Sequence, residues 1–201
     1  MTPRWLFFPS TGQSLVIHDA FGGSGALSGR TPDTIDNGNT WTTFSGQTYT
    51  VGSGYVSASN NTSDFSKVAE LDANATTYEF RSEWTANSTA SWSCGPCVAV
   101  TDGTNGSETF AKFDYVNGFR CVEYNNGSAS VTSLSSTFTV SNPFVVVLEV
   151  SGTSVDYTVT SDDGSVTYTS GTHTLSLTST SSVGVNLVSS SARCHDFKVY
   201  A

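Results

Sequence analysis

Charged side chains and helix-forming residues are both scarce in this sequence of 201 residues. Only 12% of the residues are Asp, Glu, Lys or Arg, about half the share found in ordinary soluble domains. Ala, Leu, Glu and Lys favour helices, but they are uncommon here, and no stretch longer than a turn or two reads as an amphipathic helix. Ser, Thr and aromatic residues are frequent instead, and these suit half-buried strands. The sequence therefore predicts an all-β protein whose surface is solvated mainly by hydroxyl groups.

Long apolar runs are also absent. No segment approaches the ~20 consecutive apolar residues that span a bilayer, so membrane insertion is not expected. The first residues contain one apolar patch, but Pro9 interrupts it before the core of a signal peptide could form. The patch consists of Trp5, Leu6, Phe7 and Phe8. We interpret residues 1–13 as an aromatic arm that docks on a partner protein, with packing on the chain's own domain as the alternative.

Positive charge is too sparse for a nucleic-acid partner. The sequence has 8 Lys and Arg against 17 Asp and Glu, a net charge of -9, and the basic residues are scattered. Phosphate backbones would be repelled by such a surface. No internal repeat and no change of composition marks a linker, so residues 14–201 are expected to form a single domain.

Strand patterns recur along the whole chain. Residues 144–150 are apolar, Ser151 and Gly152 suit a tight turn, and the next segment alternates between Val155, Tyr157 and Val159 on one face and polar residues on the other. Turn sequences separate further segments of this kind. So many strands predict a two-sheet antiparallel β-sandwich of jelly-roll type. The expected strands are 14–18, 40–44, 47–51, 54–58, 66–71, 76–85, 97–101, 109–116, 119–124, 128–133, 137–140, 144–150, 154–160, 165–169, 173–177, 182–188 and 194–200.

One turn predicts which residues face outward. Asn117 and Gly118 suit a two-residue type I′ turn, which would pair Tyr115 with Arg120 and Asp114 with Cys121. The outward face would then carry Lys112, Asp114, Phe119, Cys121 and Glu123. The inward face would carry Ala111, Phe113, Tyr115, Val122 and Tyr124.

Glycan binding needs an exposed aromatic ring and nearby polar groups. The candidate glycan-binding residues on the predicted outer face and its neighbouring loop are Trp92, Asp114, Phe119 and Glu123. The alternative is that Trp92 caps the core while the other three residues form a protein contact.

Short motifs at the two ends of the sequence resemble those of a known family. Asp19–Phe21, Ser24–Asp33 and Asn39–Trp41 together resemble the N-terminal pattern "D-x-F … L-x-x-R-x-P-D … W" of concanavalin A-like (laminin G-like) lectin and glucanase domains, particularly the copies in phage structural proteins. Ala192–Val199 is similar to the closing strand "a-x-x-D-x-F-x-V" of these domains, and Pro143–Val159 is similar to their "p-x-x-L-x-V-x-G-x-x-V" hairpin. The resemblance implies that the first and last strands pair, which would bring Phe21 near Phe197.

The resemblance also implies that the domain binds glycans, hydrolyses them, or serves as an adhesive or structural part of a virion or secreted protein. Glucanase members carry Glu-x-Asp-x-Glu on a strand, and the nearest segment here, Glu79-Phe80-Arg81-Ser82-Glu83, has Arg81 at its centre. Glu79 and Glu83 would lie roughly 13 Å apart on a strand, whereas glycosidase carboxylates lie about 5 to 9.5 Å apart. We therefore expect no catalytic residues, and an ionic stripe over a core face of Tyr78, Phe80 and Trp84.

The cysteines, histidines and acidic turns do not predict a cofactor. Cys94-Gly-Pro-Cys97 matches the thioredoxin motif, but a strand follows it where that redox site needs a helix. Free thiols are expected, with a Cys94–Cys97 disulfide as the alternative. A structural zinc site is not expected from these cysteines, because such sites usually have two closely spaced cysteine pairs and the second pair is missing here. The turns that begin at Asp102 and Asp162 offer oxygen ligands for calcium but are equally typical of ordinary turns. His18, His173 and His195 lie in separate strands without a nucleophile signature.

These observations favour a non-enzymatic, lectin-like surface protein of a virion, such as a phage head decoration or fibre. The expected partners are capsid or tail proteins, other copies of the same chain and a cell-surface glycan. A secreted carbohydrate-binding module or a glucanase-type glycoside hydrolase is the alternative.

Overall fold

The computed structural model describes residues 12–35, 38–44, 48–59, 69–72, 75, 77–85, 91–92, 94–104, 106–116, 119–134, 143–161, 167–169, 171–177, 181–188 and 192–201. Within these ranges every regular element is a strand. No helix in them is long and apolar enough to cross a membrane. The predicted arm residues Trp5, Leu6, Phe7 and Phe8 lie outside the described residues, as does the turn that begins at Asp162.

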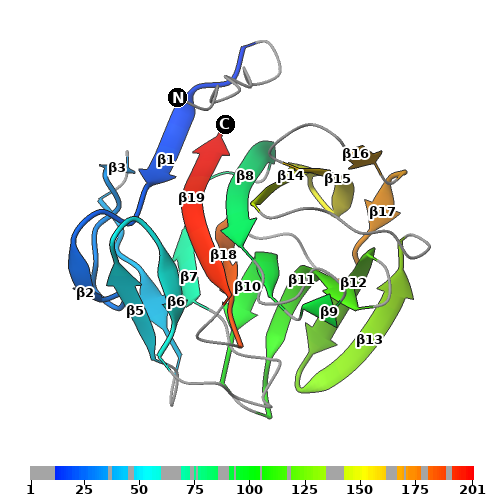
Figure 1. Ribbon diagram of the computed structural model, residues 1–201. Helices are drawn as coiled ribbons and strands as arrows, with labels where there is room; N and C mark the ends of the chain where they lie inside the picture. Colours follow the sequence, from blue (N-terminus) through cyan, green and yellow to red (C-terminus); the bar gives the residue numbers. More distant parts are fainter. Residues whose placement is uncertain are drawn as a thin grey trace.

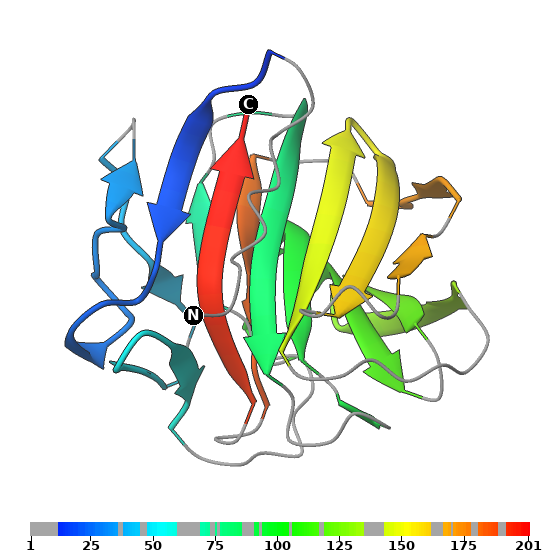
Figure 2. The same ribbon diagram turned by 45° about the horizontal axis from the view of Figure 1, so that its top comes forward.

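The strands form two antiparallel sheets. Among the described residues the larger sheet has 11 strands, and the first and last of the described strands, β1 and β19, pair near its centre. Figure 2 shows β1, β19, β8, β14 and β15 side by side in this sheet. Its path of neighbours is β16 (Thr167–Thr169), β15 (Ser154–Ser161), β14 (Phe144–Ser151), β8 (Thr77–Thr85), β19 (Arg193–Tyr200), β6 (Val56–Ala58), β5 (Tyr49–Gly52) and β2 (Ser24–Ala26). Off this path lie β1 (Leu15–Asp19), β3 (Thr34–Ile35) and β17 (His173–Thr174).

The smaller sheet, with 8 strands in the part of the chain that the structure describes, forms the second layer (Figure 1). Its path of neighbours is β13 (Ser128–Ser133), β12 (Phe119–Asn125), β11 (Thr109–Val116), β10 (Gly95–Asp102), β18 (Ser182–Asn186), β7 (Ala69–Asp72) and β4 (Thr42–Thr43), with β9 (Ser91–Trp92) paired to β11. The predicted two-sheet antiparallel sandwich is confirmed.

The core fills the space between the inner faces of the two sheets. Val155, Tyr157 and Val159 of β15 are fully buried, as the alternating pattern predicts. From the smaller sheet, the ring of Phe113 stacks on Tyr157 with 5.4 Å between ring centroids. The predicted core face of β8 is also confirmed, because Tyr78, Phe80 and Trp84 are each at most 1% exposed.

The predicted strands agree well with the observed ones. The boundaries of β11 and β13 match the prediction to the residue, and most others differ by one or two residues. Three short strands, β2, β3 and β9, were not predicted, because two or three residues carry no readable alternation. The strand predicted at 137–140 lies outside the described residues.

The predicted register of the hairpin β11–β12 is wrong by one residue. The structure pairs Tyr115 with Phe119 and Asp114 with Arg120, so three residues connect the paired positions where two were predicted. A slip of one residue turns every side chain of β12 to the opposite face. The predicted outward residues Phe119 and Cys121 therefore belong to the core.

The aromatic ring at the start of β12 explains this register. Phe119 is 1% exposed and its centroid lies 5.2 Å from that of Tyr157 and 5.7 Å from that of Tyr168. Burying a large aromatic side chain between two others stabilises the fold by more than the preference of Asn-Gly for a two-residue turn.

The four cysteines are free and buried. Cys94 packs into the main core, whereas Cys97 belongs to a smaller apolar cluster with Val100 and Phe110. Residues three apart in an extended strand point to opposite faces of the sheet. The alternative of a Cys94–Cys97 disulfide is therefore wrong, because the sheet separates the two sulfur atoms.

The N-terminal sequence motif forms a buried polar network around Asp19. Its carboxylate accepts hydrogen bonds from the backbone N–H of Phe21 (2.8 Å), from Arg30 (3.0 Å from both Nε and Nη2) and from Nε1 of Trp41 (2.9 Å). The ring of Trp41 lies between Phe21 and Phe197, with centroid distances of 6.0 and 4.9 Å. The expectation that Phe21 and Phe197 come close is met through this shared contact.

Candidate functional site

A group of polar side chains lies on the outer face of the smaller sheet, the face directed away from the main core. We call this group the Asp114 cluster. It consists of Lys112 and Asp114 of β11, Arg120 of β12 and Asn186 of β18. Lys112 and Asp114 share a face because alternate residues of a strand point the same way. Arg120 lies directly opposite Asp114 across the hairpin.

Asp114 is the centre of this cluster. Its Oδ2 atom lies 3.2 Å from Nζ of Lys112 and accepts a hydrogen bond of 3.2 Å from Nη2 of Arg120, while Oδ1 accepts a second bond from Nε. The guanidinium group is thus held by two parallel hydrogen bonds, the strongest arrangement for an arginine and a carboxylate. Nζ of Lys112 also donates to Oδ1 of Asn186 over 3.4 Å.

Gly95 lies in β10, between β11 and β18, and allows the side chain of Lys112 in β11 to reach Asn186 in β18. It pairs with Asn186 of β18. A Cβ atom at this position would lie 2.0 Å from the carbonyl oxygen of Phe113 in β11. The missing side chain therefore allows the backbones of β10 and β11 to approach closely beside Asp114.

The cluster is buried to an unusual degree. Lys112, Asp114 and Asn186 are 0% exposed, and the side chain of Arg120 is 23% exposed. Removing charged groups from water costs several kcal/mol per ion, of order 5, and their mutual attraction often only offsets that cost. A fully buried Lys–Asp pair therefore adds little net stability by itself, which makes the cluster a candidate functional site.

Aromatic rings border the cluster. The ring of Tyr124 stacks on that of Phe110 at 4.9 Å and 29°, and Nζ of Lys112 lies 5.9 Å from its centroid. Tyr124 is half-buried, and Val131 on the neighbouring strand β13 is 55% exposed. Arg120 of the cluster and the bordering Tyr124 are thus the residues exposed enough to reach a ligand, and they contact Asp114 and Lys112, respectively.

The structure places the four predicted glycan-binding residues at different locations. Asp114 lies on the outer face as predicted, but it is buried within its ion pairs. Phe119 and Glu123 lie on the inner face of β12, 1% and 7% exposed, so the prediction that they face outward is wrong. The backbone of Trp92 pairs with Tyr115, beside the cluster on β11.

The three other members of the cluster were not predicted as site residues. Asn186 lies far away in the sequence, and only the fold brings it to Lys112. Lys112 and Arg120 could have been noticed, because charged residues alternate with aromatic residues in their strands. Placing Arg120 opposite Asp114, however, required the correct register of the hairpin.

The carboxylates of β8 lie on the outer face of the larger sheet. Glu79 is only 2% exposed and forms an ion pair with Arg81, whose guanidinium carbon lies 5.8 Å from the ring centroid of Tyr200. The stripe predicted from these residues exists, but Glu79 is buried instead of solvated. Its carboxylate is engaged by Arg81.

The turn after β10 is explained without calcium. Oδ1 of Asp102 accepts a hydrogen bond of 2.7 Å from the backbone N–H of Thr104, and Oε1 of Glu108 accepts one of 3.0 Å from Gly106. Side-chain carboxylates that accept from the backbone two residues away stabilise ordinary turns.

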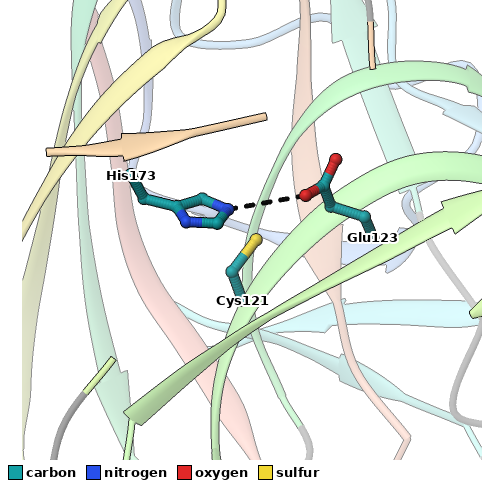
Figure 3. A group of neighbouring side chains, drawn as sticks. All are labelled: Cys121, Glu123 and His173. Atoms are coloured by element: carbon teal, nitrogen blue, oxygen red, sulfur yellow. Dashed lines mark ion pairs between the residues drawn. The ribbon is translucent and has the colours of Figure 1, made fainter. Parts of the chain in front are cut away.

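A second group of side chains could hold a metal ion. Cys121, Glu123 and His173 each offer one ligand atom, and these atoms lie within 4.8 Å of one another (Figure 3). This group lies on the inner face of β12, so it is separate from the Asp114 cluster.

No protein-family model matches the sequence, and no curated protein matches it. Solved structures do match. The GH43 protein BlXynB from Bacillus licheniformis, as its K247S mutant, gives a TM-score of 0.61 at 12% identity over 92% of this chain and 39% of that chain. The VIP36 exoplasmic/lumenal domain in its Ca2+/Man-bound form gives 0.51 at 12% identity over 86% and 84%.

The chain has a concanavalin A-like jelly-roll fold. A third match, xylan β-1,4-xylosidase from Bacillus halodurans C-125, has a TM-score of 0.57 at 8% identity. The present jelly roll spans only 39% of the BlXynB chain and 41% of the xylosidase chain, whereas it is nearly the size of the VIP36 domain. At these identities the likeness concerns the fold.

Proposed function

We propose that this jelly roll is a non-enzymatic glycan-binding module on the surface of a virion, and that the Asp114 cluster holds the glycan. The observation that carries the proposal is the pairing of a fully buried carboxylate with the partly exposed Arg120, on the same strand face as the half-buried ring of Tyr124, which borders Lys112. A planar polar group and an aromatic ring on one face of a sheet can bind the hydroxyl groups and the apolar face of successive sugar units.

Asp114 positions Arg120 for this role. It engages the Nε and Nη2 atoms, and within the described residues no hydrogen bond engages Nη1. The Nη1 hydrogens are donors suited to the oxygen atoms of a sugar. Because the guanidinium is fixed before the ligand arrives, little side-chain entropy is lost on binding.

The proposal that the module is non-enzymatic rests on the carboxylates of β8. Glu79 is buried and paired with Arg81, so it is poorly placed to attack or protonate a glycosidic bond. The likeness to BlXynB and the xylosidase motivates a direct assay for the glycoside hydrolase alternative. This fold covers about two fifths of each of those longer chains.

The location on a virion rests on the resemblance of the Asp19–Trp41 motif to copies in phage structural proteins. In this proposal residues 1–13 attach the module to a capsid or tail protein through Trp5, Leu6, Phe7 and Phe8. A protein that lacks residues 1–12 should keep its fold and lose its attachment to the virion. Attachment that survives the deletion would reject the role of the arm.

A glycan array followed by calorimetry tests the binding site. Arg120→Ala and Tyr124→Ala should each weaken binding of the selected glycan by about tenfold or more, the equivalent of about 1.4 kcal/mol. Lys198→Ala is the matched control, since Lys198 lies on the outer face of the larger sheet and is 31% exposed. Equal affinity in all three variants would reject the Asp114 cluster as the site.

A reducing-sugar assay on xylans and β-glucans tests the non-enzymatic character. We expect no turnover by the wild-type protein. Turnover that disappears in Glu79→Gln or Glu83→Gln would establish the glycoside hydrolase alternative.

A further inference from the structure

The inner face of β12 carries a group of potential metal ligands that is independent of the proposed glycan site. Cys121 and Glu123 are alternate residues of this strand, so they share a face. His173 comes from β17, which pairs with β15 in the larger sheet through Val155. Figure 3 shows the three side chains converging from these two strands.

The three donor atoms are a sulfur, a carboxylate oxygen and an imidazole nitrogen. All lie within 4.8 Å of one another, and Nε2 of His173 lies 3.5 Å from Oε1 of Glu123. Ligand atoms of a tetrahedral zinc ion lie about 3.3 to 3.7 Å apart, given bond lengths of about 2.0 to 2.3 Å. The His173–Glu123 pair already has this spacing, and the sulfur needs to move by about 1 Å to reach it.

Glu123 is oriented for a ligand at one of its two oxygen atoms. Oε2 accepts hydrogen bonds from the backbone N–H and the hydroxyl of Ser176, both at 2.7 Å, and from the N–H of Leu177 at 3.3 Å. These bonds fix the carboxylate and direct Oε1 toward His173. Hydrogen bonds of this kind orient the carboxylate ligands of metal ions.

His173 has a polar atom that the protein does not satisfy. Its Nε2 is buried and makes no hydrogen bond to the described residues, and Oε1 of Glu123, 3.5 Å away, forms an ion pair with it only when the ring is protonated. Buried polar atoms without a partner are rare, and each requires an explanation. A cation between Nε2, Oε1 and Sγ would satisfy it.

We propose that Cys121, Glu123 and His173 form a binding site for a divalent transition-metal ion, with Zn2+ as the ion that suits the donors best. Thiolate, imidazole and carboxylate are the three ligand types that zinc uses in proteins. Three protein ligands leave one coordination position for water. Binding breaks the S–H bond of Cys121, the sulfur keeps the electron pair and coordinates the metal, and the proton passes to the buffer.

Burial explains why the thiol keeps its proton in the absence of metal. Burial raises the pKa of Cys121 well above its ordinary value, and the negative charges of Glu123 and Asp114 raise it further. A divalent cation beside the sulfur reverses this balance. Metal binding should therefore release the thiol proton.

A site at this place would connect the two sheets. β12 belongs to the smaller sheet and β17, a strand of two residues, pairs at the edge of the larger one. Since the ligands converge only in the folded protein, metal binding should raise the melting temperature through mass action.

Cobalt spectroscopy tests the proposal on the full chain after treatment with a chelator. Co2+ alone should produce the thiolate-to-cobalt charge-transfer band in the near ultraviolet at a stoichiometry of one ion, and Zn2+ should displace it and raise the melting temperature. Cys121→Ser should abolish the band, and His173→Gln should weaken Co2+ binding by about tenfold or more, the equivalent of about 1.4 kcal/mol.

The buried thiol Cys194 provides the matched control, because it lies in β19 outside this group. Cys194→Ala should keep the charge-transfer band. Circular dichroism establishes that each variant is folded, and if Cys121→Ser is not, the wild-type band and the His173→Gln variant decide the question. A wild-type protein without the band, or a band that survives in Cys121→Ser, overturns the proposal.

Discussion

The indole Nε1 of Trp41 donates a hydrogen bond of 2.9 Å to Oδ2 of Asp19, a carboxylate with no exposed surface. The same carboxylate binds Arg30, so Asp19, Arg30 and Trp41 of the N-terminal motif meet at one point. The network ties the segment after β1 to the core ring of Trp41. The motif is therefore a structural element of the fold, which explains why it resembles a family without indicating an activity.

Asp19→Asn should destabilise the protein strongly. The substitution leaves the guanidinium of Arg30 without its buried counter-charge, and we expect the free energy of unfolding to fall by about 2 to 4 kcal/mol. Urea denaturation measures the effect. Asp33→Asn is the control, because Asp33 also pairs with Arg30 but is 45% exposed, and it should cost at most about 1 kcal/mol. Equal losses in the two variants would contradict the central role of Asp19.

The architecture was predictable because its signals are local. The alternation of Val155, Tyr157 and Val159 and the tight turn at Gly152 are visible in one short segment, and the structure confirms both. The face of β12 was not predictable in the same way. Asn117-Gly118 favoured one register, but contacts of Phe119 with Tyr157 and Tyr168, distant in sequence, stabilise the other.

Gly95→Ala should disrupt the contact between β10 and β11. The new Cβ atom would lie 2.0 Å from the carbonyl oxygen of Phe113, which is backbone and cannot rotate away. We expect a loss of at least about 1 to 3 kcal/mol in the free energy of unfolding. Gly52→Ala in β5 is the matched control, since a Cβ atom there meets nothing within 4 Å. A Gly95→Ala protein as stable as Gly52→Ala would refute this packing.

Tyr157→Phe should leave the protein equally stable or make it more stable. The hydroxyl of Tyr157 is buried in the core and has no hydrogen-bond partner among the described residues, and such a group costs about 1 to 3 kcal/mol. Tyr168→Phe makes the reverse test, because the hydroxyl of Tyr168 donates to the carbonyl of Leu134 and its loss should cost about 1 kcal/mol. Thermal denaturation compares the two variants with the wild type. A melting temperature of Tyr157→Phe below that of the wild type would show that the hydroxyl of Tyr157 does have a stabilising partner.

Stability should decrease in acid through Asp196. Burial alone would raise the pKa of this carboxyl, but hydrogen bonds and charges from His18 and Lys198 outweigh it and hold the pKa below the ordinary 3.8. The folded state therefore binds the proton less tightly than the unfolded state. The stabilisation is present above the ordinary pKa and is lost as the pH falls through the lowered one.

The Asp196→Asn variant isolates this contribution. The difference in free energy of unfolding between wild type and variant should be largest near pH 5 and shrink as the pH falls below the ordinary pKa of the carboxyl. Urea denaturation across this range measures it. A difference that does not change with pH would show that the contacts with His18 and Lys198 do not depend on the charge of Asp196.

The two candidate sites were less accessible to sequence reasoning than the fold. Lys112 and Asn186 are separated by 74 positions, and Glu123 and His173 come from strands of different sheets. No local pattern predicts such contacts, because they depend on which strands become neighbours. Asp114 was found in advance because its position on the outer face follows from alternation within β11 alone.

The backbones of Ser14 and Ala201 hydrogen-bond to each other in both directions, at 2.9 and 3.0 Å. β1 and β19 are antiparallel, so a force that pulls the two ends apart acts at the same end of the pair. The load falls on one hydrogen bond at a time instead of on the whole ladder. We expect this module to open by unzipping at low force when it is stretched between two anchors, and the central strands to resist only after β1 has peeled away.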